Sequence, residues 1–126
     1  MKRKPIFISI TIIVVITISY AYNNFFTEKM IEGPYINRNY NNSSNKVEIP
    51  HVADTLVLLK NNQFSSGFWG KGSYRIIYSV RGTEIQLTYN YEFGKAGFRA
   101  FIKRLYFGKP KIILDHDQNH YYEKLN

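Results

Sequence analysis

The chain of 126 residues contains no cysteine, and this absence excludes several kinds of chemistry. Without cysteine the protein has no disulfide bonds, iron–sulfur clusters, thiol nucleophile or thiolate zinc site. Attachment of a lipid to an N-terminal cysteine is excluded for the same reason. Whatever this protein does, it does without cysteine chemistry.

Recognisable catalytic motifs are also lacking. The sequence has no G-x-S-x-G element, no phosphate-binding loop and no dinucleotide-binding fingerprint. Asp54 with Glu84 or Glu92 would be a candidate acid and base pair, but each lies in a predicted strand or turn, where a solvated carboxylate is the ordinary outcome. We therefore expect no enzyme and no cofactor, because nothing assembles a nucleophile, a base and an orienting group.

Charge is missing from one long segment, Pro5 to Thr27, and this segment follows three positive charges in residues 2–4. At about 1.5 Å per residue, residues 5–26 cover roughly the ~30 Å hydrocarbon core of a bilayer. Under the positive-inside rule, the basic end stays in the cytoplasm and residues 28–126 cross to the other side. The sequence predicts a single-pass signal anchor in a bacterial cytoplasmic membrane, with the C-terminal domain outside the cytoplasm.

A cleaved signal peptide is the alternative reading of the same segment. The small residues Ser19 and Ala21 flank Tyr20 at a spacing that suits a signal peptidase. Phe25 and Phe26 favour an uncleaved anchor, because aromatic side chains at that depth are typical of a helix end at the membrane interface. Cleavage would instead give a secreted or periplasmic protein.

The rest of the chain has room for one domain, because about 100 residues support a single modest core. We divide the sequence into an anchor (1–27), a linker and loop (28–50) and a β-domain (51–126). Residues 32–46 are rich in Asn, Ser, Gly and Pro, which discourage regular structure. Residues 33–36 can still contribute a first short strand.

Alternation of apolar and polar residues dominates the predicted domain, most clearly over residues 84–93. Ile85, Leu87 and their alternate neighbours face one side, and Glu84 and Gln86 face the other. Polar or glycine-rich turns are predicted at 61–62, 81–83, 94–97 and 115–119. The fold class is therefore all-β: an antiparallel meander of about six to eight strands, forming a curved sheet or a partly open small barrel after one N-terminal transmembrane or signal helix.

Residues 98–107 fit two structures. Phe98, Phe101, Ile102 and Leu105 have the spacing of an amphipathic helix. The neighbouring pattern is β throughout, and local helix propensity is easily overridden by tertiary context, so we favour a strand and keep the helix as an alternative.

A family resemblance accompanies this order of elements. It is carried by the segments Gly33-Pro34-Tyr35, Asp54 to Leu58, Phe64, Gly72 to Ile76, Glu84 to Tyr89 and Tyr121 to Lys124. In these segments the chain resembles small uncharacterised exported β-domains of bacteria and, more loosely, bacterial lipocalin-like domains. The resemblance implies a curved antiparallel sheet or partly open barrel, and it supplies no catalytic motif.

No metal site is expected. Asp115, Asp117 and Asn119 match the start of a calcium-binding EF-hand loop, but the central glycine and the final ligands are missing. His116 and His120 lie four residues apart in the same turn, which is not helical, and His51 is remote in sequence. A hairpin turn explains these residues better.

The strongest candidate for a binding site is a basic run between Glu92 and Asp115. It contains six cations and no acid, interleaved with aromatic residues; the cations are Lys95, Arg99, Lys103, Arg104, Lys109 and Lys111. Such a surface can bind nucleic acid, but the predicted membrane address favours anionic lipid or an envelope protein as partner instead. A solvated strand face over an aromatic core is the plain alternative.

We therefore expect a membrane-anchored extracytoplasmic β-domain with a non-catalytic binding or envelope-structural role. One alternative is a secreted lipocalin-like binder of a small apolar ligand, with a cavity lined by Tyr74, Tyr89, Tyr91 and Trp69. The other is an inhibitor or immunity-type protein that contacts its partner through Phe68 and Trp69, predicted to be exposed on a glycine-flanked loop.

Overall fold

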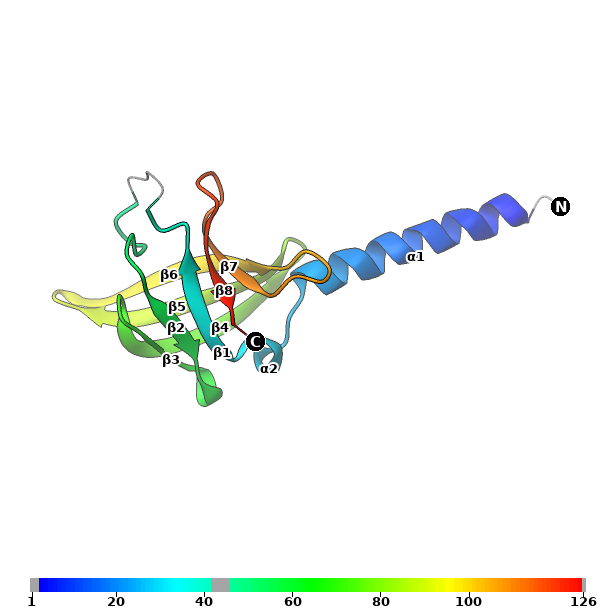
Figure 1. Cartoon of the computed structure of the whole chain (residues 1–126). Helices are drawn as coiled ribbons and strands as arrows, with labels where there is room; N and C mark the ends of the chain where they lie inside the picture. Colours follow the sequence, from blue (N-terminus) through cyan, green and yellow to red (C-terminus); the bar gives the residue numbers. More distant parts are fainter. Residues whose placement is uncertain (1–2, 42–45, 126) are drawn as a thin grey trace.

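The computed structural model describes residues 3–41 and 46–125, which form a long helix followed by a closed antiparallel barrel (Figure 1). The elements are α1 (Lys4–Asn24), α2 (Glu28–Ile31), β1 (Gly33–Arg38), β2 (Thr55–Leu58), η1 (Lys60–Asn62), β3 (Gln63–Ser66), β4 (Gly70–Ser79), β5 (Gly82–Tyr91), β6 (Gly94–Lys103), β7 (Lys111–Asp115) and β8 (His120–Lys124). The fold is mostly β, with one N-terminal apolar helix, as the sequence predicts.

The barrel is a simple meander in which each of eight strands pairs with the next one along the chain. The last strand, β8, pairs with β1 and closes the barrel, with Tyr35 opposite Lys124. β1 also pairs with β2, so the barrel begins at Gly33. The domain boundary predicted at residue 51 is therefore too late, while the short strand predicted at 33–36 is a full member of the barrel.

The interior is filled by side chains that alternate along the strands. On β5, Ile85 and Leu87 point inward and are each 1% exposed, whereas Glu84 and Gln86 are only partly buried. The predicted register is correct for Ile85 and Leu87, but the predicted alternation over 84–93 is too long: Tyr91 is 50% exposed, and Phe93, in the turn after the strand, is 83% exposed. Buried hydrophobic residues from most of the chain complete the core: Phe26, Ile31, Tyr35, Ile49, Leu56, Leu58, Phe64, Trp69, Tyr74, Ala100, Ile102, Ile112, Leu114 and Tyr122.

Residues 94–103 form the strand β6, which pairs with β5 along its whole length. The strand predicted for residues 98–107 is confirmed as far as Lys103, and residues 104–107 belong to the following loop. The alternative helix is wrong, because residues 98–103 alternate between the two faces of the barrel wall. The turn before β6 lies at Glu92 and Phe93 rather than at 94–97. Asn61 and Asn62 both have positive φ angles, of 61° and 59°, as a tight turn requires.

Asp54 is partly buried and hydrogen-bonded, and is not the solvated carboxylate predicted from the sequence. Its Oδ2 accepts hydrogen bonds from Tyr122 and, at 3.0 Å, from Ser66 Oγ; its Oδ1 accepts one from Gly67 N at 2.9 Å. Burial and the hydrogen bond to Asp54 raise the pKa of the Tyr122 hydroxyl, which therefore remains a donor. This network ties β3 and β8 to the segment before β2.

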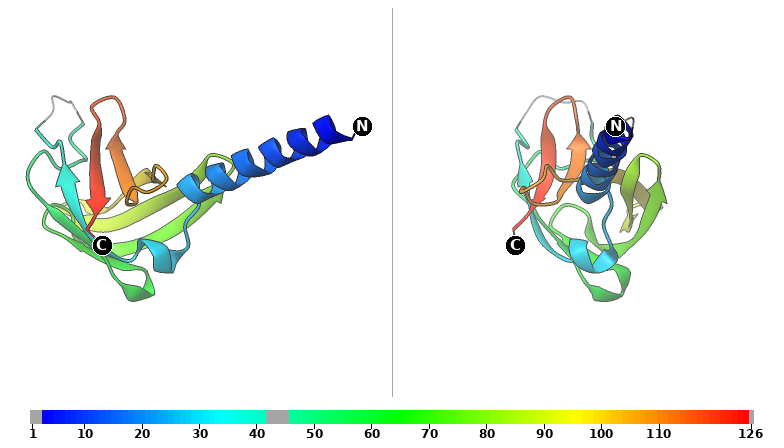
Figure 2. Two further views of the ribbon diagram at one scale, coloured as in Figure 1. Left: turned by 45° about the vertical axis from the view of Figure 1, so that its right-hand side comes forward. Right: turned by 90° about the vertical axis from the view of Figure 1, so that its right-hand side faces the viewer.

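The helix α1 leaves the barrel at one end and projects away from it (Figure 2). It is long and apolar enough to cross a membrane by length and composition, with a mean hydropathy of 2.1, and none of its residues is buried. A signal sequence near the N-terminus would satisfy the same criteria.

Candidate functional site: a cationic groove beside β6 and β7

β6 and β7 are paired at only two positions, Ile102 with Ile112 and Lys103 with Lys111. Next to this short ladder the outer wall is hollowed into an open groove of about 740 Å³. Its lining comes from β6, β7, β8 and the adjoining loops: Arg99, Ala100, Phe101, Lys103, Arg104, Leu105, Lys111, Ile113, Leu114, His116, Asn119 and Tyr121. Short pairing between two neighbouring strands thus coincides with an open hollow in the outer wall.

Strand alternation places the cations of the groove on its outer wall. Arg99 and Lys103 flank Phe101 on the outward face of β6, while Ala100 and Ile102 point into the core. Lys111 extends the same surface on β7. The ammonium groups of Lys103 and Lys111 lie over aromatic rings, 5.2 Å from the centre of Phe101 and 4.5 Å from the centre of Tyr121. Positive charge and apolar surface are therefore interleaved.

The groove carries four cations, and none of its lining residues is acidic. Arg99 is partly neutralised, because its Nε lies 4.0 Å from the carboxylate of Glu84. Glu123, which lies opposite Lys111 across the strand pair, has its carboxylate 3.6 Å from Arg38. The groove keeps a net positive charge, and an anionic group held in it would meet no carboxylate on the wall.

Two of the groove cations also hold the end of α1. The Nζ of Lys103 donates to Asn24 Oδ1 at 2.7 Å. Arg104 Nε donates to the carbonyl of Tyr22 at 2.7 Å, and its guanidinium lies 3.7 Å from the centre of the Tyr22 ring. Cations at a helix C-terminus interact favourably with the exposed carbonyls and the helix dipole. This double role was not apparent from the sequence.

The basic run is thus divided by the fold. Arg99, Lys103, Arg104 and Lys111 meet at the groove, while the other two cations lie elsewhere. Lys95 is at the opposite end of β6, beside a small pocket with Gly72 and Ser73. Lys109 is in the loop after β6, where its Nζ donates to the carbonyl of Leu125 at 2.7 Å.

The predicted aromatic contact loop is only half correct. Phe68 is 42% exposed, but Trp69 is 5% exposed and stacks on Phe98 with ring centres 5.5 Å apart. The expectation that Trp69 is exposed is wrong, because its ring is buried and also contacts the rings of Tyr89 and Tyr122. Beside it lies a shallow hollow of about 330 Å³, which Tyr89 and Tyr91 help to line. Tyr74, also predicted to line a ligand cavity, is buried in the core.

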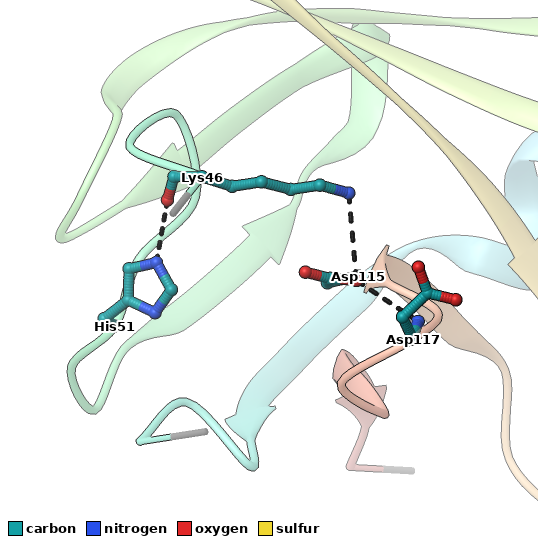
Figure 3. Close-up of polar contacts among 4 residues, drawn as sticks. All are labelled: Lys46, His51, Asp115 and Asp117. Atoms are coloured by element: carbon teal, nitrogen blue, oxygen red, sulfur yellow. Dashed lines mark hydrogen bonds and ion pairs between the residues drawn. The ribbon is translucent and has the colours of Figure 1, made fainter. Parts of the chain in front are cut away.

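The acidic turn is tied to a neighbouring loop by polar contacts (Figure 3). The Nζ of Lys46 lies 3.8 Å from Asp115 Oδ1, and that oxygen also accepts the backbone N–H of Asp117 at 3.2 Å. His51 Nε2 lies 2.7 Å from the carbonyl of Lys46. Within residues 3–41 and 46–125, no group of three or more metal-ligating side chains is found. A hairpin turn, as expected, accounts for the two aspartates.

His51 is remote from His120 in sequence but close to it in space, with ring centres 5.6 Å apart. His120 is buried, and its Nε2 lies 2.7 Å from Asn37 Oδ1. Burial lowers the pKa of His120, and His51 lowers it further, against a smaller opposing effect of Asp115. The neutral form of His120 is therefore the one that this site stabilises.

Comparison with protein-family models, with curated proteins and with solved structures finds no match to this chain. The resemblance to exported and lipocalin-like β-domains stays a prediction.

Proposed function

We propose that this protein is a membrane-anchored β-barrel, displayed outside the cytoplasm, that binds an anionic amphiphile in the groove beside β6 and β7. The role is binding rather than catalysis. The observation that carries the proposal is the set of four cations on an apolar wall, directly beside the end of the helix that is able to span a bilayer.

The anchor is supported by how α1 joins the barrel. Tyr20 donates its hydroxyl to the carbonyl of Val80 at 2.5 Å, and Thr83 donates to the carbonyl of Asn24 at 2.9 Å. Cleavage after Ala21 would cut within the last helical turns, between these two contacts. An uncleaved α1 keeps both, and its exposed apolar surface then lies in lipid.

The ligand class follows from the two kinds of surface in the groove. Cations attract phosphate or carboxylate groups, and the aromatic and aliphatic wall favours an attached apolar chain. A phospholipid head group with the first part of its acyl chains has both properties. The head groups also lie at the level where α1 would leave the membrane, so such a ligand is present at high local concentration.

The test uses the full chain in a neutral detergent, with a fluorescent phosphatidylglycerol as ligand and phosphatidylcholine as competitor. We compare the wild type with a variant carrying Arg99→Gln and Lys111→Gln. These two cations line the groove, and their side chains contact Glu84 and Tyr121 of the barrel wall. At about 1 kcal/mol for each cation, the double variant should bind the anionic lipid roughly 30-fold more weakly.

The matched control replaces two exposed lysines outside the groove, Lys60→Gln and Lys71→Gln, and has the same net charge. Binding unchanged in this control and weakened in the groove variant supports the site. An equal loss of affinity in both variants would indicate non-specific electrostatic attraction and would contradict the groove as the binding site. Strong competition by glycerol phosphate would assign the site to a free anion instead of an amphiphile.

A further inference from the structure

Two loops stand beside the C-terminal end of α1, at the end of the barrel from which the helix leaves (Figure 1). One joins β4 to β5 and has Val80 at its tip; the other, residues 104–110, joins β6 to β7. Val80 is 89% exposed, Leu105 is 74% exposed and Phe107 is fully exposed. The two loops beside the helix end therefore carry three large apolar side chains that are mostly exposed.

Hydrogen bonds fix both loops to the helix. The first loop accepts the Tyr20 hydroxyl through the Val80 carbonyl. In the second loop, the backbone N–H of Arg104 donates to the carbonyl of Asn23 at 2.9 Å, and that of Tyr106 donates to Asn23 Oδ1 at 2.8 Å. The loops are consequently level with the last turn of α1, and they cannot swing away from it without losing these bonds.

The side chains between the apolar tips are basic. Residues 79–82 and 104–110 contain three cations, Arg81, Arg104 and Lys109, and no acid. Apolar tips flanked by cations and by a tyrosine are suited to the bilayer interface, where apolar groups reach the acyl chains and cations reach phosphate. In water the same tips would expose apolar surface with no compensating contact.

We propose that the two loops form a collar, Val80, Leu105, Tyr106 and Phe107, which inserts into the outer interface of the bilayer that α1 spans. This inference rests on the proposed function, because it takes α1 as a membrane span. The collar holds the barrel upright on the membrane, with the groove opening at the head-group layer. Arg104 and Leu105 connect the two surfaces, because they lie in the second loop and also line the groove. The partner of this surface is lipid.

The opposite end of the barrel provides an internal control for the collar. Gly82 at the start of β5 lies against Asn24 of α1. The far end of the β5–β6 hairpin carries Phe93, which is 83% exposed and lies about 30 Å away along a ten-residue strand. Phe93 resembles Phe107 in size and exposure but lies at the opposite end of the barrel, so it is the natural control.

The absence of cysteine allows single labels to be placed at will. Four variants of the full chain, Val80→Cys, Phe107→Cys, Phe93→Cys and Ile12→Cys, each receive a polarity-sensitive fluorophore. They are reconstituted in nanodiscs of phosphatidylcholine and phosphatidylglycerol. Emission is then quenched separately by iodide in the water, by a nitroxide near the top of the acyl chains and by a nitroxide near the chain ends.

We expect the labels at 80 and 107 to emit at shorter wavelength, to be protected from iodide and to be quenched by the shallow nitroxide. The label at 93 should behave in the opposite way, and the label at 12 should be quenched by the deep nitroxide. Labels at 80 and 107 that are open to iodide, with the label at 12 still in lipid, would overturn the collar and leave the anchor intact.

Two other results, at positions 12 and 93, would also contradict the proposal. A label at 12 that is open to iodide would remove the membrane span, and with it both this inference and the proposed anchor. Lipid quenching at 93 as well as at 107 would show a barrel lying on its side, which contradicts the upright orientation.

Discussion

Replacing Leu87 by alanine tests the core of the barrel directly. Leu87 lies in the middle of β5, is 1% exposed and faces Tyr74 on β4 and Phe98 on β6 across the two strand pairs. The change removes three carbon atoms, at about 0.8 kcal/mol for each buried methylene, and leaves a cavity that the large neighbours cannot easily fill. We therefore expect the free energy of unfolding to fall by about 2 to 4 kcal/mol.

The measurement is equilibrium unfolding in denaturant, with the full chain in mild detergent. The protein contains one tryptophan, Trp69, and its burial in the barrel makes its fluorescence a direct probe of the core. The matched control is Thr88→Ala, the next residue on the same strand with its side chain on the outer face, where the loss should stay below about 1 kcal/mol. Similar unfolding midpoints for the two variants would show that the register of β5 is wrong.

The remaining predictions concern the helix junction and acid stability. Arg104→Ala removes a charged hydrogen bond to the last turn of α1. The distance between a spin label on α1 and one on the barrel should therefore become more broadly distributed, whereas Arg81→Ala should leave this distribution unchanged. Equal distributions in the two variants would show that Arg104 does not hold the helix. The pKa of buried His120 lies below its usual value of 6.5, so as the pH falls this histidine is protonated in the unfolded chain before it is protonated in the folded protein. The free energy of unfolding should therefore be highest above about pH 7 and should decline on acidification. His120→Gln should flatten this decline and the exposed-site variant His116→Gln should not; the same pH dependence in all three proteins would refute the assignment to His120.

The fold was predictable where the residues of a single strand show a clear alternation of apolar and polar side chains. Ile85 and Leu87 alternate with Glu84 and Gln86 in a pattern that fits only a half-buried strand, and the structure confirms it. Phe98 to Leu105 fitted a helix equally well by spacing. Residues 94–102 form a strand because they pair with β5. Such pairing is a tertiary effect that the local sequence does not determine.

The groove was predictable only in part. The basic run was visible in the sequence, but the separation of Lys95 and Lys109 from the groove depends on the register of β6 against β7. The engagement of Arg104 with α1 joins residues 82 positions apart, and the packing of Trp69 inside the barrel depends on four neighbouring rings. These contacts form only when the barrel closes, so residue spacing along the chain does not predict them.

The most direct test of the account is native mass spectrometry of the full chain released from nanodiscs that contain equal amounts of phosphatidylcholine and phosphatidylglycerol. We predict one protein mass that includes residues 1–26, close to 14.8 kDa, carrying a bound lipid that is predominantly phosphatidylglycerol. The same preference should disappear when Arg99 and Lys111 are both replaced by glutamine. A protein that begins at Tyr22, or bound lipids in the same proportion as in the bilayer, would contradict the claim that this is an anchored barrel with a groove for an anionic amphiphile.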